Sequence, residues 1–160
     1  MPKFHLNTGS MADAQRYAEL PAFTQGYIEA MFFTECEQGG NFDPENGSPL
    51  PEESGFADLA PETLREIEND CRKFMGTLPR DLSGRTDIDD ACDYAPGDYD
   101  EKAAGRDFWY TRNGHGVGFW DRGFGDLCSP GTVGYRLSQH AKSFGECSVY
   151  LGDDERIYLM

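Results

Sequence analysis

The chain has 160 residues and a formal net charge of −15, from 29 Asp and Glu against 14 Lys and Arg side chains. This length predicts a single domain, and no apolar run approaches the roughly 20 residues that a membrane-spanning helix requires. The excess of carboxylates argues against direct binding to nucleic acid or anionic membranes, which need a basic protein surface, and favours a partner protein whose own surface is basic.

The first ten residues lack the apolar stretch of a signal peptide. The triplet Gly9-Ser10-Met11 is typical of a cloning scar. We therefore interpret residues 1–10 as a vector-derived tail and residues 11–160 as the single domain. The five cysteines lie far apart without Cys-x-x-Cys spacing, which predicts reduced thiols in a cytoplasm. Neither a metal site nor a cofactor is expected.

Apolar side chains at helical spacing predict a first helix over residues 22–37, which Gly39 and Gly40 would end. Residues 38–57 are rich in Gly, Pro, Asn and Glu and should form an irregular loop. A second helix is predicted from Pro61, a residue typical of a first helical turn, to Gly76. The expected buried stripes are Phe23, Tyr27, Ala30, Met31 and Thr34 in the first helix, and Leu64, Ile67, Cys71, Phe74 and Met75 in the second.

Residues 79–106 are polar and acidic and are predicted to form a long loop. Their carboxylates do not follow the spacing of a calcium-binding loop, so a solvated acidic segment is favoured over a metal site. If these side chains share one face, they are the candidate binding residues for a basic partner: Asp87, Asp89, Asp90, Asp93, Asp98, Asp100 and Glu101.

Residues 107–123, with the sequence DFWYTRNGHGVGFWDRG, are predicted to form a β-hairpin that turns at Asn113-Gly114. A two-residue turn sets Trp109 over Gly118, whereas a four-residue loop pairs Trp109 with Trp120. In both registers the two tryptophans lie on the face opposite the other aromatic side chains. Trp109 and Trp120 are therefore either packed under a loop or available to anchor an interface.

A third helix is predicted over residues 132–144, with Thr132 as its N-cap and Gly145 as its end. A second hairpin joins residues 148–151 to residues 156–159, and a three-residue loop would pair Leu151 with Ile157 and Val149 with Leu159. The predicted fold class is α+β: a small antiparallel sheet of about four strands, from two hairpins, with about three helices packed on one face.

Several segments resemble a family of small proteins encoded by tailed bacteriophages and prophages. The likeness covers most of residues 23–158. It rests on FTQGYIEA (23–30), LAPETL (59–64), VYLGDD (149–154) and above all the motif DFWxTRNGHGxGFWDRG at 107–123. The resemblance implies a phage origin and action in the cytoplasm of a host bacterium. It implies no particular activity and no catalytic residues.

Two functions of different classes follow from these features. In the first, the chain is an acidic phage accessory protein that binds and inhibits a host nucleic-acid-binding or defence protein, by DNA mimicry if its carboxylates form one surface. In the second, it is a small hydrolase or phosphate-handling enzyme. A histidine beside a carboxylate can act as a general base, and an arginine can hold a phosphate. The residues for that role are His115, Asp121 and Arg122.

The sequence favours the binding protein over the enzyme. It shows no nucleophile with an activating partner and no phosphate-binding glycine loop. The glycines at 114, 116 and 118 are explained more simply by a turn and by close packing against a tryptophan. The partner's identity and the oligomeric state stay open.

Overall fold

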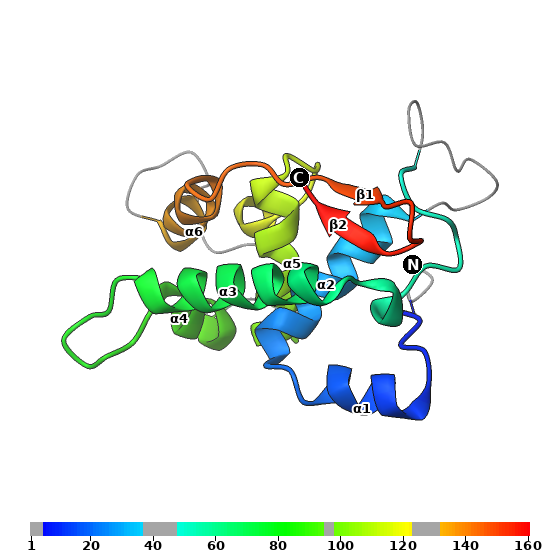
Figure 1. Ribbon diagram of the computed structural model, residues 1–160. Coiled ribbons are helices and arrows are strands. Elements are labelled where there is room, and N and C mark those ends of the chain that lie inside the picture. The colour runs from blue at the N-terminus through cyan, green and yellow to red at the C-terminus, as the bar shows by residue number, and fades with distance from the viewer. Residues whose placement is uncertain (1–4, 37–47, 95–97, 123–131) are drawn as a thin grey trace.

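The structure is a computed structural model that describes residues 5–36, 48–94, 98–122 and 132–160 (Figure 1). These residues form six helices, two short 3₁₀ turns and one two-stranded antiparallel sheet. The helices are α1 (Met11–Ala18), α2 (Ala22–Glu35), α3 (Pro61–Thr77), α4 (Asp87–Tyr94), α5 (Glu101–Arg112) and α6 (Val133–Lys142), the turns are η1 (Phe56–Asp58) and η2 (Phe119–Asp121), and the strands are β1 (Val149–Leu151) and β2 (Ile157–Leu159).

The predicted α+β fold with about four strands and three helices on one face is therefore wrong. The described chain is mostly helical, and its only strands are those of the C-terminal hairpin. Figure 1 shows α2 and α5 crossing at the centre of the molecule, with α3 lying across α2. The core forms around this crossing from large apolar side chains, among them Phe23, Tyr27, Phe74, Phe108 and Trp109.

The α2–α5 crossing is so close that the two backbones touch. A Cβ atom built on Gly26 would lie 1.8 Å from the carbonyl oxygen of Lys102, and one on Gly105 would lie 1.8 Å from that of Phe23. No side chain fits at either position, because such distances are far inside van der Waals contact. Glycine at both positions thus sets how closely the central helices pack.

Three predicted helices and one predicted hairpin are confirmed. The helices expected over residues 22–37, 61–76 and 132–144 are α2, α3 and α6, and the Thr132 side chain caps α6 by accepting a hydrogen bond from the backbone N–H of Tyr135. The C-terminal hairpin has the expected register, with Leu151 opposite Ile157 and Val149 opposite Leu159.

The expected loop over residues 79–106 contains α4 and the first half of α5 instead. Thr86 and Asp89 cap α4, since the Asp89 carboxylate accepts from the Thr86 N–H at 2.9 Å. Asp100 caps α5 by accepting from the N–H of Ala103 at 2.8 Å. Ile88 and Ala91 anchor α4 in the core. The aspartates that were expected in a solvated loop thus cap helices or lie on the outer face of α4.

The hairpin expected over residues 107–123 is also wrong, because α5 continues to Arg112 and η2 follows it. Asn113 is the C-cap of α5, and Gly114 comes next with φ of +68°. A left-handed glycine just after a helix satisfies the last carbonyls of that helix. The Asn-Gly pair therefore ends a helix here, although the same pair is typical of a hairpin turn.

The remaining boundary predictions concern the start of the chain and residues 38–57. Residues 37–47 lie outside the described residues; beyond them, Leu50 forms a β-bridge with Cys36. Residues 5–10, interpreted as a tail, pack on the domain: the Asn7 carbonyl accepts from the N–H of Phe56 at 2.9 Å, and Ser10 caps α1. None of the helices in the described parts of the chain is both long and apolar enough to cross a membrane.

Candidate functional site

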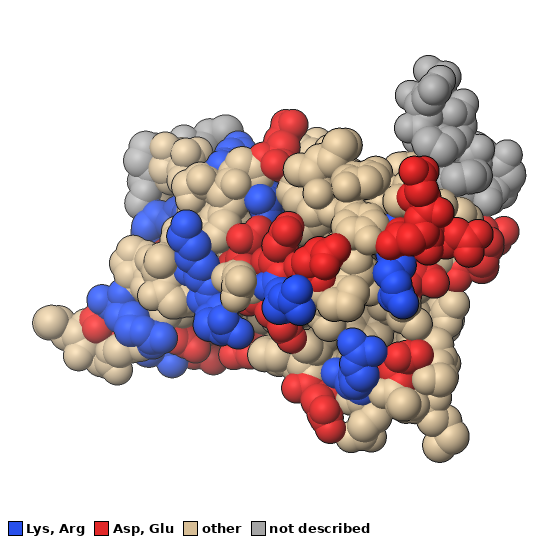
Figure 2. Space-filling view, in the orientation of Figure 1, with Lys and Arg blue, Asp and Glu red and all other residues tan. Residues whose placement is uncertain are grey.

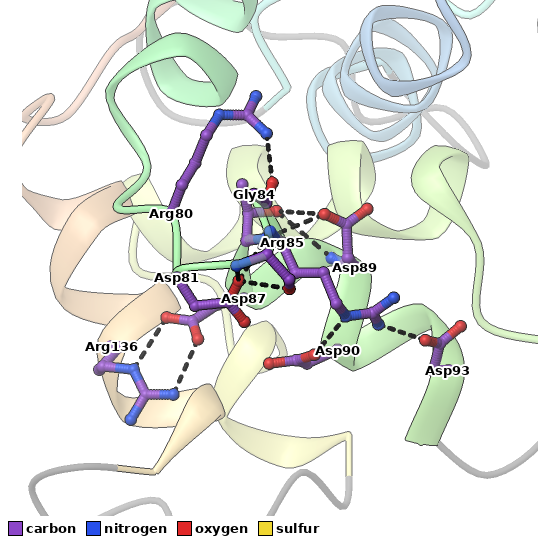
Figure 3. Close-up of polar contacts among 11 residues, drawn as sticks. Arg80, Asp81, Gly84, Arg85, Asp87, Asp89, Asp90, Asp93 and Arg136 are labelled. Carbon is purple, nitrogen blue, oxygen red and sulfur yellow. Dashed lines mark hydrogen bonds and ion pairs between the residues drawn. The ribbon is translucent and has the colours of Figure 1, made fainter.

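The predicted acidic binding residues of α4 are largely engaged in ion pairs within the protein (Figure 3). Arg136 of α6 donates two hydrogen bonds to the Asp87 carboxylate, at 2.8 and 2.7 Å. Arg85 contacts both Asp90, at 3.2 Å, and Asp93. Two arginines therefore neutralise much of the charge of this helix, and they hold α4 to α6 and to the preceding turn.

The other predicted acidic residues have mostly structural roles. Asp89 and Asp100 are helix caps, and Glu101 occupies the first turn of α5, where a negative charge is favourable to the helix dipole. Asp98 is exposed. The segment thus brings its carboxylates near one another without presenting them as one uncompensated anionic face.

Neither tryptophan is a free interface anchor. Trp109 is completely buried in the core, and its indole N–H donates to the Thr34 hydroxyl at 2.8 Å. Trp120 is half-buried, and its indole lies against Gly118. The tryptophans therefore belong to the packing of α5 and η2.

Asp107 and Arg122 form an ion pair whose carboxylate is buried. The sequence analysis did not connect these two residues. The Asp107 side chain is 1% exposed. It accepts from Arg122 at 2.8 and 3.1 Å and from the Tyr99 hydroxyl at 2.8 Å. Burial raises the pKa of Asp107, against the effect of these hydrogen bonds, which lower it. This ion pair thus joins the middle of α5 to the residue just after η2.

Arg112, also in the motif, is a buried arginine that the sequence analysis did not predict. Its guanidinium donates to the Asp70 carboxylate at 2.9 Å, to the Tyr27 hydroxyl at 3.0 Å and to the Gly145 carbonyl at 2.9 Å. These contacts tie α5 to α2, to α3 and to the turn after α6. Its role is structural.

The predicted catalytic residues do not come together. Arg122 and Asp121 lie side by side, but Arg122 is held by Asp107, and Asp121 accepts from the N–H of Gly118. His115 lines a different cavity, of about 330 Å³, together with Glu35, Cys147 and six other residues. The proposed set of His115, Asp121 and Arg122 is therefore not assembled as one site.

The described lining of the His115 cavity also contains no activated nucleophile. His115 Nε2 lies 3.8 Å from a Glu35 carboxylate oxygen, too far for a hydrogen bond. Burial raises the pKa of the Cys147 thiol and that of the Glu35 carboxyl. A raised thiol pKa keeps the sulfur protonated at neutral pH, whereas nucleophilic attack requires the thiolate. Among the residues that the structure describes, no group of three His, Cys, Asp or Glu side chains is placed to bind a metal ion.

The C-terminal hairpin places exposed carboxylates next to two stacked tyrosines. Tyr150 and Tyr158 stack across the two strands with their ring centroids 5.6 Å apart, and Tyr150 is 40% exposed. The turn beside them consists of Asp153, Asp154 and Glu155, all exposed. We call these five residues the hairpin surface.

The carboxylates of the hairpin surface form no ion pair with the described residues. The Tyr158 hydroxyl donates to Asp154 at 2.6 Å, and this hydrogen bond lowers the pKa of Asp154. None of the three forms an ion pair with another residue in the described parts of the chain. In the sequence, the turn at Gly152-Asp153-Asp154 predicted the hairpin, but no pattern predicted that its carboxylates and tyrosines form a surface. Compared with protein families, curated proteins and solved structures, the chain shows no match.

Proposed function

We propose that this is an acidic binding protein that docks on a basic surface of another protein and inhibits it. Following the resemblance to phage proteins, the partner would be a host nucleic-acid-binding or defence protein in a bacterial cytoplasm. The observation that carries the proposal is the hairpin surface, where carboxylates without an ion pair adjoin a stacked tyrosine pair whose Tyr150 is exposed. It replaces the α4 aspartates and the tryptophans as the binding residues.

The chemistry of the hairpin surface suits a cationic partner. A lysine or arginine can stack on the face of an exposed tyrosine while a neighbouring carboxylate neutralises its charge. Both tyrosines are held by strand pairing and by their mutual stacking, so little side-chain entropy is lost on binding. A partner with a row of basic residues would find both kinds of contact at once.

The distribution of charge supports docking from this side. On the face that Figure 2 shows, acidic side chains gather over the middle of the molecule and on the side where the β1–β2 turn lies in Figure 1, with a basic side chain among them, whereas basic side chains are densest on the other side, over the C-terminal half of α3. Such a separation orients an acidic protein as it approaches a basic surface and speeds association at low salt. If the partner's basic surface is its nucleic-acid site, bound protein and DNA exclude one another, as DNA mimicry requires.

The test is capture of partners from a nuclease-treated bacterial lysate over a series of salt concentrations. We expect a nucleic-acid-binding protein to be retained at low salt and released as salt rises, because screening weakens the contacts between charges. The purified partner should then lose DNA in a competition assay when this protein is added. Absence of any retained nucleic-acid-binding protein at low salt would contradict the proposal.

A matched pair of variants locates the docking surface. Substituting Tyr150→Ala, Asp153→Asn and Glu155→Gln together should weaken binding by about tenfold or more. The control, Glu19→Gln with Glu66→Gln, removes two exposed carboxylates elsewhere and should leave affinity within about threefold, because exposed charges outside the interface act only through screened fields. Equal losses in the two variants would mean that net charge, and not this surface, drives binding.

A further inference from the structure

A small cavity beside α5 has a lining unlike the rest of this acidic molecule. It has a volume of about 260 Å³ and is lined by Tyr99, Ala103, Arg106, Tyr110 and Arg122. Among the residues that the structure describes, no carboxylate belongs to this lining. The cavity near His115 contains Glu35 and Glu146, and a third cavity, between α2 and α3, contains Glu68 and Glu101. The described lining thus contributes two arginines and two tyrosines to this space and no acidic side chain.

Arg122 is held in one orientation by the buried carboxylate behind it. Its Nε and one Nη donate to Asp107, while the side chain as a whole is 35% exposed. The other Nη has no partner among the described residues, and it belongs to a side chain that lines the cavity. Asp107 therefore acts as a positioning residue that fixes the guanidinium and leaves its outer edge available.

Arg106 and Tyr110 also have hydrogen-bond donors that no described residue satisfies. Arg106 reaches Glu29 only at 3.5 Å, and it shares that carboxylate with Lys102, which lies 3.4 Å away. The Tyr110 hydroxyl has no hydrogen-bond partner in the parts of the chain that the structure describes, although the side chain is 9% exposed. Polar groups so placed gain free energy from an acceptor that enters the cavity.

We infer that this cavity binds a small oxyanion, specifically a phosphate group, between Arg106 and Arg122. Two guanidinium forks and a phenolic donor match the several acceptor oxygens of a phosphate, whereas a carboxylate offers two oxygens in one plane. The cavity's volume suits a phosphate or a small phosphomonoester rather than a nucleotide. This inference stands apart from the proposed function, because the hairpin surface contains none of these residues.

The test is titration of the full chain with sodium phosphate, followed by isothermal calorimetry and by the NMR signals of the arginine Nε–H groups. Sodium chloride at matched ionic strength is the reference. We expect saturable binding that shifts the Arg106 and Arg122 signals. The same titration with acetate should bind at least about tenfold more weakly. A response that merely follows ionic strength, or equal binding of acetate, would overturn the inference.

Variants separate the cavity from general charge effects. Arg106→Gln and Tyr110→Phe leave the Asp107–Arg122 pair intact, and each should weaken phosphate binding, Arg106→Gln by about tenfold. Arg65→Gln, which removes an exposed arginine on α3, should leave the affinity unchanged. If Arg106→Gln binds phosphate as the parent does, the cavity is not the site. Phenyl phosphate distinguishes the natural source, since tighter binding than phosphate indicates an ester and weaker binding indicates the free anion.

Discussion

At the scale of single residues, the Asp107–Arg122 pair is the most consequential contact. Removing two charges from water is costly, and their attraction offsets that cost only with good geometry and further hydrogen bonds. Here Arg122 donates through two nitrogens and Tyr99 completes the set. The pair therefore adds little net free energy, yet losing Arg122 leaves the Asp107 carboxylate buried and uncompensated.

We expect Arg122→Gln to lower the free energy of unfolding by about 3 kcal/mol at neutral pH. The loss should shrink as pH falls. Asp107 has a raised pKa in the folded protein, so its contribution is most favourable at low pH, where it is neutral, and is lost as pH rises through that pKa. Without Arg122, the pKa of Asp107 in the folded protein rises further, so the variant loses more of its free energy of unfolding as pH rises. Urea unfolding over a pH series measures both effects.

Arg85, an exposed arginine that forms ion pairs with two aspartates of α4, provides a control. Arg85→Gln removes contacts to Asp90 and Asp93 that are open to solvent, so it should lower the free energy of unfolding only slightly. Its effect should also vary little with pH near neutrality. A loss for Arg122→Gln that is equally small, or that grows on acidification, would show that Asp107 is not the buried carboxylate responsible.

Glu155 gives a second prediction at this scale, because it is the only non-glycine residue with a positive φ, +65°, in the described chain. A side chain in that region is strained, whereas glycine is not. Glu155→Gly should therefore raise the free energy of unfolding by up to about 1 kcal/mol. Thermal unfolding tests this, with Glu155→Gln as the control that removes the charge and keeps the strain. If both variants gain equally, charge repulsion in the turn is the cause.

At the scale of elements, the α2–α5 crossing decides the fold. Alanine normally stabilises a helix relative to glycine, but at Gly105 a Cβ would meet the Phe23 carbonyl at 1.8 Å. Because that obstacle is backbone, it can be relieved only if the helices move apart. We expect Gly105→Ala to cost about 3 kcal/mol by forcing this separation.

Gly76 of α3 is the matched control, since a Cβ built there meets nothing within 4 Å. Gly76→Ala should raise the free energy of unfolding by about 0.5–1 kcal/mol through helix propensity alone. Denaturant unfolding of both variants gives opposite signs if the crossing is as close as described. A stabilising Gly105→Ala would refute the backbone contact.

The elements that could be predicted from the sequence are those with a clear apolar period. The stripe through Ile67, Cys71 and Phe74 lies on one face of α3, and all three are buried. Strand pairing around Gly152 was equally predictable, because loop length sets the register. In these segments local pattern and tertiary packing agree.

The missed elements show where local signals are ambiguous. Asn113-Gly114 serves a helix end as well as a hairpin, and the β-forming residues Phe108, Trp109 and Tyr110 are helical because both faces of α5 are buried. In α4, Thr86 and Asp89 have the spacing of a capping box, a signal outweighed by the surrounding aspartates. The set of His115, Asp121 and Arg122 depended on the predicted hairpin. Because α5 is helical up to Arg112 instead, His115 and Arg122 lie in the segments that follow α5 and η2, and they line different cavities.

At the scale of the whole molecule, the excess negative charge is distributed unevenly. Six arginines lie in ion pairs with carboxylates: Arg16, Arg85, Arg106, Arg112, Arg122 and Arg136. The carboxylates that these pairs leave over include those of the hairpin surface. Like charges that remain unpaired repel one another in the compact state, which lowers stability at low ionic strength.

Added salt should therefore stabilise this protein. Raising sodium chloride from about 10 mM to physiological strength shortens the Debye length from about 30 to 8 Å, which screens repulsion between separated carboxylates more than it weakens the buried pairs. We expect the melting temperature to rise by several degrees. The rise should be smaller in the Asp153→Asn, Glu155→Gln variant, which carries two fewer exposed charges. Calorimetry over a salt series measures both slopes, and a melting temperature that falls with salt would mean that exposed ion pairs, rather than carboxylate repulsion, dominate the electrostatics of the fold.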